Sequence, residues 1–205
     1  MTSFTRYTGR PPRTLTSAEQ QLLLEVTAED HASYRDHVIY SMALATGLRE
    51  HELVALNVGD VYHGNGQPRQ WITLRVFKQS TRHRGHQEVL LPDALREKLA
   101  TFRDWKRYEG EGLSPSAPLF LSRIGRRLSK RQLRHGFTVW QRRAGFERRH
   151  TFHSLRHTAC DNLYRLSRDI RLTQRFARHS SLNTTMIYTH PSDDYLVQTV
   201  QGLTC

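Results

Sequence analysis

The stretch Ala177-Arg-His-Ser-Ser-Leu-Asn-Thr-Thr-Met-Ile-Tyr188 places a tyrosine nine residues after a histidine. Two further segments lie toward the N-terminus. His153-Ser-Leu-Arg156 puts a histidine and an arginine one turn apart on a predicted helix, so that their side chains share one face. Ala45-Thr-Gly-Leu-Arg-Glu-His-Glu-Leu-Val-Ala-Leu56 adds another arginine just after a glycine. In chain order, the sequence offers two arginines, two histidines and a tyrosine.

The charge balance indicates a nucleic-acid partner. Among 205 residues there are 31 Lys+Arg against 19 Asp+Glu, a formal net charge of +12. Four of the basic residues are lysines, and the arginines that make up the rest suit bidentate contact with phosphate. Because a protein can also be basic for solubility alone, the charge selects a class of partner and no more.

Segments that would direct the chain to a membrane or out of the cell are not seen. No run approaches the roughly 18 apolar residues of a membrane span. The first residues lack the apolar core of a signal peptide, and Cys160 and Cys205 form no spacing pattern. We therefore expect a cytoplasmic, nucleoid-associated protein without a membrane partner.

Hydrophobic periodicity predicts a mainly α fold with a small antiparallel β-sheet, an α+β domain. Thr16-Ser-Ala-Glu19 is a capping box for a helix to about Thr27. A second helix spans His31–Thr46 until Gly47 breaks it, and a short one follows at 49–56. Two strands are expected at 71–77 and 87–91. Further helices are expected at 93–108, 129–143, 153–166, 169–178, 183–189 and 193–201.

The three opening segments, taken in order, resemble the catalytic motifs of the tyrosine recombinase family, which includes phage integrases and Xer-like enzymes. Each motif alone is weak evidence, whereas their order and separations are specific. The resemblance covers about residues 15–195. It implies the tyrosine recombinase catalytic-domain fold. It also implies site-specific DNA cleavage and rejoining through a 3′-phosphotyrosine intermediate, with no metal, cofactor or ATP.

The resemblance also implies a role for each motif residue. Arg49 and Arg156 match the two arginines that stabilise the charge accumulating on the non-bridging oxygens of the scissile phosphate. Tyr188 matches the nucleophile, and a phenol with an ordinary pKa of about 10 needs a base at neutral pH. His153 is implied to accept its proton. His179 is implied to bond a non-bridging oxygen.

The family's proton donor to the leaving 5′-oxygen is a lysine in a β-hairpin turn. Lys78 is the only lysine in the predicted hairpin. Its surroundings, Phe77-Lys-Gln-Ser-Thr, lack the usual glycines, and the connection to Pro92 is longer than expected. Arg82 and Arg84 are therefore candidate DNA contacts. Since arginine is a poor proton donor, Lys78 remains the predicted acid.

Supporting residues are predicted around this set. Glu52 lies three residues after Arg49, where the family carries an acidic residue, and is expected to orient Arg49 or a neighbouring histidine. Arg126 and Arg127 are expected to contact backbone phosphates. Tyr195 is the fallback nucleophile.

A metal site is an alternative interpretation of the clustered histidines. His153 and His157 have the His-x-x-x-His spacing of metal ligands, and His150 is near in sequence. The arginine between the two histidines would repel a cation, so no metal is expected.

The predicted organisation is a basic arm or linker remnant at 1–14, the catalytic domain at 15–190 and a C-terminal tail at 191–205. In the family such a tail can dock onto a neighbouring protomer. The expected partner is double-stranded DNA carrying a specific recombination site, with assembly into a tetramer on that DNA. Because family members typically carry an N-terminal helical domain, the chain is either a solo catalytic domain or a fragment.

Two other functions stay open at this point. A type IB topoisomerase-like enzyme shares the Arg/Lys/His/Tyr chemistry but relaxes supercoils without choosing a site. A non-catalytic DNA-binding relative would keep the fold and form no covalent adduct.

Overall fold

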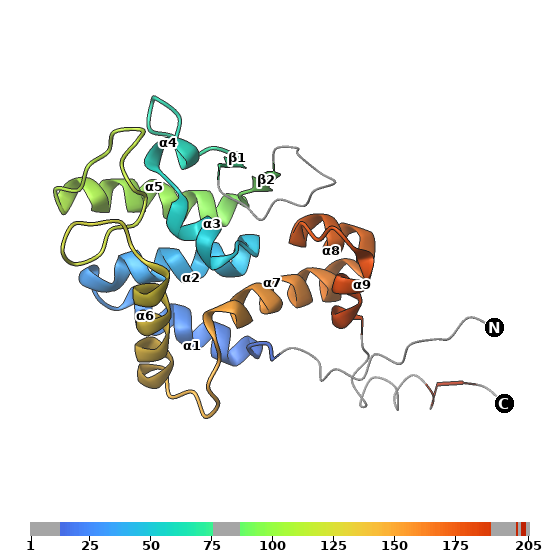
Figure 1. Ribbon diagram of the computed structural model, residues 1–205. Helices are drawn as coiled ribbons and strands as arrows, with labels where there is room; N and C mark the ends of the chain where they lie inside the picture. The colour runs from blue at the N-terminus through green and yellow to red at the C-terminus, as the bar shows by residue number, and fades with distance from the viewer. Residues whose placement is uncertain (1–12, 76–86, 190–199, 201, 204–205) are drawn as a thin grey trace.

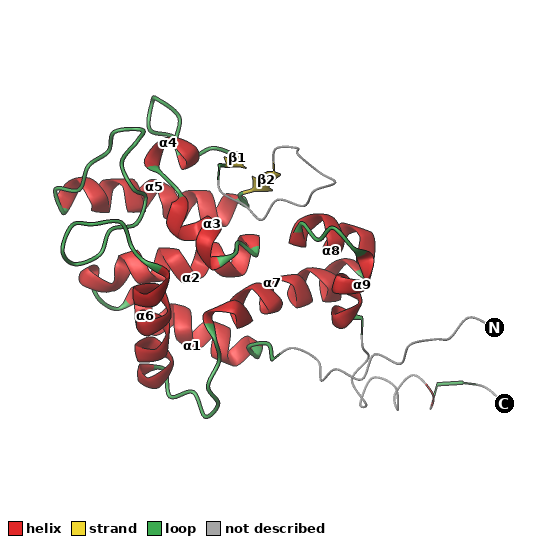
Figure 2. Ribbon diagram, in the orientation of Figure 1, coloured by secondary structure: helices red, strands yellow, loops and turns green. Residues whose placement is uncertain are grey.

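Helices make up most of the described chain, and one short antiparallel hairpin interrupts them (Figures 1 and 2). The computed structural model describes residues 13–75, 87–189, 200 and 202–203. The elements are α1 (Ser17–Ala28), a 3-10 turn η1 (His31–Ser33), α2 (Tyr34–Thr46), α3 (Glu50–Ala55), α4 (Val58–Val61), β1 (Trp71–Leu74), β2 (Gln87–Leu90), α5 (Asp93–Tyr108), α6 (Lys130–Arg143), α7 (Phe152–Ser167), α8 (Ile170–Ala177), α9 (Leu182–Thr185) and a 3-10 turn η2 (Met186–Tyr188). The predicted fold class is confirmed.

The predicted signals at the ends of the first two helices are confirmed. Glu19 N donates to Thr16 Oγ1 at 3.1 Å, and Thr16 N donates to Glu19 Oε2 at 2.7 Å, which completes the capping box. α2 ends at Gly47, whose φ of 59° is left-handed. A Cβ at Gly47 would lie 3.0 Å from Phe176 Cε1, so glycine also permits α8 to approach closely.

The hydrophobic core surrounds α2, which packs against α1, α5 and α7. Its members include Val38, Met42, Leu99, Phe102 and Leu155, all fully buried. Each such side chain contributes about 1.5–3 kcal/mol relative to an exposed one. The helices that carry the predicted site residues are therefore anchored to one common core.

The hairpin alternates between a buried and an exposed face. Ile72 pairs with Val89 on the buried side, while Trp71 pairs with Leu90 on the exposed side. β1 is shorter than predicted, because Arg75 leaves the ladder and bonds Asp60, with Nη2 to Oδ2 at 2.7 Å. Residues 76–86 lie outside the described part of the chain, and so does the predicted strand end at Phe77.

Sequence periodicity missed one element and merged two others. α4 is a single turn, opened by Asn57 N donating to Asp60 Oδ2 at 2.7 Å. The helix expected at 183–189 is instead α9 followed by the 3-10 turn η2. Most of the helix expected at 193–201 lies outside the described residues. None of the described helices is both long and apolar enough to span a bilayer.

α7 connects the two parts of the molecule that matter for function. It crosses the centre from α1 and α6 toward α8 and α9 (Figure 1). It packs against both α2 and α8. Residues from α7, from the α2–α3 turn and from the end of α8 can therefore meet.

Candidate active site

Arg156 bridges the ends of two helices. Its side chain is buried on α7, at 3% exposure. Nη1 donates to the Gly47 carbonyl at the end of α2, and Nη2 donates to the Ala177 carbonyl at the end of α8. Burial and the neighbouring Arg49 lower the pKa of Arg156 to about 10. The guanidinium therefore remains charged at neutral pH and is fixed in place.

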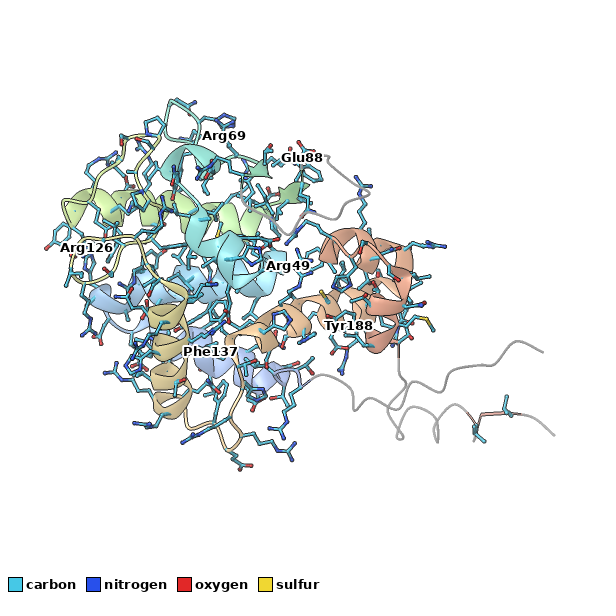
Figure 3. The ribbon with its side chains drawn as sticks, in the orientation of Figure 1. Arg49, Arg69, Glu88, Arg126, Phe137 and Tyr188 are labelled. Atoms are coloured by element: carbon cyan, nitrogen blue, oxygen red, sulfur yellow. The ribbon has the colours of Figure 1, made fainter. Side chains whose placement is uncertain are left out.

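Arg49 is held from the opposite side, at the start of α3 (Figure 3). Its backbone N donates to Glu52 Oε2 and its Nη1 donates to Glu52 Oε1, both at 2.7 Å. Its Nη2 donates to the Arg178 carbonyl at 3.4 Å. The two predicted arginines thus bond consecutive carbonyls, Ala177 and Arg178, at one helix end.

Glu52 is a buried carboxylate shared by two arginines. Arg178 Nη2 donates to Glu52 Oε2 at 2.7 Å, while Arg49 takes Oε1. Burial acts to raise the pKa of Glu52, but the charges of Arg178 and Arg49 and the bond from the Arg49 backbone hold that pKa below its ordinary value. The carboxylate is therefore ionised and positions both guanidinium groups.

Arg178 was missed by sequence reasoning. No periodic pattern marks it, because it lies in the turn just after α8. Its only signal is its place between Ala177 and His179, inside a motif that was already recognised.

Tyr188 lies in a buried cluster at the end of η2 (Figure 3). It is 5% exposed and packs against Cys160 and Ala177. Its hydroxyl lies 2.8 Å from His157 Nδ1, within hydrogen-bond distance. Burial and the Cys160 thiol raise the pKa of Tyr188, so that the phenol keeps its proton at neutral pH.

The hydroxyl of Tyr188 thus meets His157 rather than His153, the implied proton acceptor. The rings of His153 and His157 touch edge to face, with centroids 4.6 Å apart. Burial, His153 and Arg156 lower the pKa of His157 to about 4. Partial burial of the His153 ring, followed by the charge of Arg156, lowers its pKa. Both rings are neutral at pH 7 and available as proton acceptors.

His179 directly follows the turn that ends α8. Its Nδ1 lies 3.0 Å from Thr185 Oγ1, which orients the ring. The ring lies nearly parallel to that of Tyr188, at 6.4 Å between centroids and 10° between planes. Burial, followed by the charges of Arg156 and Arg49, lowers the pKa of His179 to about 4. It is a neutral hydrogen-bonding group at pH 7.

The third histidine of the metal alternative points elsewhere. His150 Nε2 lies 3.2 Å from Glu19 Oε1 on α1. Across the ranges 13–75 and 87–189, no group of three or more His, Cys, Asp or Glu side chains is arranged to hold a metal ion.

Among the predicted residues that the structure describes, Arg126 and Arg127 are not part of this cluster. Lys78, Arg82 and Arg84 lie outside the described residues. Arg126 is exposed and lies at the opposite edge of the molecule from Tyr188 in Figure 3. Arg127 Nη1 donates to the carbonyls of Val54 and Leu56, at 3.0 and 2.9 Å, so in this structure it binds the protein's own chain.

The assembled groups are suited to stabilising an anion. Arg49 and Arg178 share the carboxylate of Glu52, while Arg156 bonds backbone carbonyls, so positive charge is in excess. His153 and His179 are neutral and can exchange protons or share hydrogen bonds. Fixed cationic donors of this kind stabilise charge that develops on phosphoryl oxygens.

The order and spacing of these residues agree with a comparison across protein families. Residues 13–194 match the Phage integrase family. This chain belongs to the phage integrase family. The match includes every described residue of the site.

Relatives within the phage integrase family are recombinases. The chain is 31% identical over 179 residues to tyrosine recombinase XerC of Neisseria meningitidis serogroup C, covering 87% of this chain and 54% of the relative. It is similar to the crystal structure of XerA recombinase, with a TM-score of 0.75 and 26% identity, covering 96% of this chain and 68% of that one. XerH site-specific recombinase, solved in a post-cleavage complex with palindromic difH substrate, gives a TM-score of 0.73 at 23% identity and shares the fold, covering 94% of this chain and 54% of that one. This chain spans about half the length of XerC.

Proposed function

We propose that this chain is the catalytic domain of a site-specific DNA recombinase that cleaves and rejoins DNA through a 3′-phosphotyrosine intermediate. The observation that carries the proposal is the convergence of Arg49 and Arg156 on adjacent carbonyls at the end of α8, directly before His179. A phosphodiester entering this site would place its non-bridging oxygens among fixed guanidinium groups. Removing one donor from such a site typically costs about 3 kcal/mol in the barrier.

The proposed reaction is a transesterification. Tyr188 Oη forms a bond to phosphorus while the bond from phosphorus to the 5′-oxygen breaks. The phenolic proton passes to His153, and Lys78 protonates the leaving 5′-oxygen. Rejoining reverses both transfers, with a 5′-hydroxyl attacking the phosphotyrosine. The phosphotyrosine bond keeps the energy of the phosphodiester bond that breaks, so rejoining needs no ATP.

Tyr188 has to leave its buried position before it can attack. Its hydroxyl bonds His157 inside a buried cluster, so the phenol has to break this contact before its oxygen can attack phosphorus. The proposal therefore includes a rearrangement of α9 and η2 when DNA binds. These two elements span Leu182–Tyr188 and follow directly after α8 and its turn.

The proposed partner is double-stranded DNA that carries a recombination site, bound by a tetramer in the cytoplasm at the nucleoid. The excess of 31 Lys+Arg over 19 Asp+Glu supports binding to a polyanion. The complex of the related XerH with its difH substrate supports a specific duplex site. The proposed domain spans residues 15–190, with the arm at 1–14 and the tail at 191–205.

The proposal is tested with nicked suicide substrates made from inverted repeats that flank the gene. The wild-type protein should form a covalent protein–DNA adduct that survives denaturing electrophoresis, and Tyr188→Phe should form none. Tyr195→Phe is the matched control and should keep the adduct. An adduct from Tyr188→Phe would sink the nucleophile assignment. Relaxation of plasmids that lack any such repeat would favour a topoisomerase instead.

A further inference from the structure

Arg178 has a backbone conformation that side chains disfavour. Its φ is 53° and its ψ is 45°, in the left-handed region. Among the residues that the structure describes, Arg168 and Arg178 are the non-glycine residues with positive φ. The strain of this conformation has to be offset by contacts that the residue makes elsewhere.

The turn at Arg178 exposes the two backbone carbonyls that Arg156 and Arg49 bond. Arg178 N donates to the Arg175 carbonyl at 3.0 Å and His179 N donates to the Gln174 carbonyl at 3.1 Å, which closes the end of α8. The chain then turns away, and the carbonyls of residues 177 and 178 are left for Arg156 and Arg49. The backbone at this position thus orients both predicted arginines.

The side chain of Arg178 also stabilises this turn, through bonds to Glu52 and to the Phe176 carbonyl. It is 7% exposed and folds back under the turn. Nη2 donates to Glu52 Oε2 at 2.7 Å, and Nη1 donates to the Phe176 carbonyl at 3.2 Å. Its Nε has no hydrogen-bond partner within the described part of the chain. Glu52 cannot rotate toward solvent without losing this bond, so Arg49 keeps a fixed partner.

We propose that Arg178 is a positioning residue for the cleavage reaction, which holds Arg49 through the shared carboxylate of Glu52. This inference rests on the proposed function. It assigns to Arg178 a role distinct from those of Arg49 and Arg156, because Arg178 acts on the phosphate through another side chain.

The test compares the same substitution at two left-handed positions. Arg178→Gly keeps the turn, since glycine favours positive φ, and removes only the side chain. Single-turnover adduct formation at saturating protein should fall on the order of a hundredfold, because misplacing a charged group by about 1 Å costs this much. Arg178→Lys should recover part of the rate. Arg168→Gly, at the exposed turn after α7 with φ 55°, is the matched control and should react like the wild type.

Two further measurements separate this inference from the proposed function. A neutral methylphosphonate at the scissile position should shrink the penalty of Arg178→Gly, which a merely structural role would not do. Hydrogen exchange at the Arg49 guanidinium, followed by nuclear magnetic resonance in the free protein, should accelerate in Arg178→Gly.

The outcomes are distinguishable. A wild-type protein that forms no adduct overturns the proposed function, while the exchange measurement still decides the role of Arg178. Wild-type rates from Arg178→Gly, or unchanged exchange at Arg49, overturn the inference alone.

Discussion

The two halves of the site differ in how far they are prepared for reaction. The arginine side, Arg49, Arg156 and Glu52, is held by buried hydrogen bonds to backbone carbonyls and between side chains. The tyrosine side, Tyr188 with His157 and Cys160, is closed on itself. The groups proposed to stabilise charge are fixed by the fold, whereas the proposed nucleophile, Tyr188, is buried and bonded to His157.

This difference has a physical reason. Preorganised donors stabilise a developing charge because they need not reorient during the reaction, so they gain from a rigid core. A nucleophile that attacks DNA gains nothing from being exposed before DNA is bound. Substitutions on the two sides should therefore have opposite effects on the rate of adduct formation.

The largest effect is expected from Arg156→Lys. Lysine keeps the charge but cannot donate to the carbonyls of Gly47 and Ala177 at once, because it lacks the planar fork of a guanidinium. Adduct formation on a suicide substrate should fall on the order of a hundredfold to a thousandfold. DNA binding measured by mobility shift serves as the control. A rate within threefold of wild type would contradict the fixed arginine side.

Glu52→Gln should have the next largest effect. The neutral amide leaves Arg49 and Arg178 without a counter-charge in a buried site, at a cost of about 3 kcal/mol in the free energy of unfolding. Urea denaturation measures this cost, and adduct formation should fall on the order of a hundredfold as Arg49 loses its orientation.

Combining Glu52→Gln with Arg178→Gly tests whether the two residues act together. Because Glu52 and Arg178 act as one unit, Arg178→Gly should slow the Glu52→Gln protein little further. Fully multiplicative effects of the two changes would show that they act independently.

His157→Phe should act in the opposite direction. It removes the hydrogen-bond partner of the Tyr188 hydroxyl and so destabilises the resting position by about 1 kcal/mol. Adduct formation should rise by about fivefold, measured under single-turnover conditions at saturating DNA. A decrease would mean that His157 takes part in the chemistry and that Tyr188 reacts from its place beside His157.

The smallest effect is a dependence of stability on pH. Burial lowers the pKa values of His157 and His179 to about 4, below their ordinary value of 6.5. The unfolded chain therefore binds protons first, and this contribution is complete above pH 6.5 and is lost as pH falls toward 4. The melting temperature should drop on the order of a few degrees between about pH 7 and about pH 5. The variants His157→Gln and His179→Gln should each flatten this slope.

Much of the fold could be predicted because its signals are local. The capping box at Thr16 and Glu19 and the left-handed break at Gly47 depend on neighbouring residues alone, and both are observed. The contact between Arg49 and Glu52 was also anticipated, since residues three apart share a helix face. Their roles in cleavage remain proposals.

The parts that could not be predicted depend on tertiary contacts. Nothing in the sequence marks Arg178 as left-handed, because arginine rarely adopts positive φ and the contact with Glu52 spans 126 residues. The hydroxyl of Tyr188 was expected near His153 but meets His157, one turn further along α7. The role of Lys78 as the acid stays a prediction, because this residue lies outside the described part of the chain.

Cys160 lies against Tyr188, so its reactivity can report whether the tyrosine is in its buried position. Its thiol is fully buried, and burial raises its pKa, so it should react slowly with alkylating reagents. Tyr188 forms part of the wall that covers it. The proposed departure of Tyr188 would give solvent access to the sulfur. The alkylation rate of Cys160, measured in a Cys205→Ser background, should therefore report how often Tyr188 leaves this cluster.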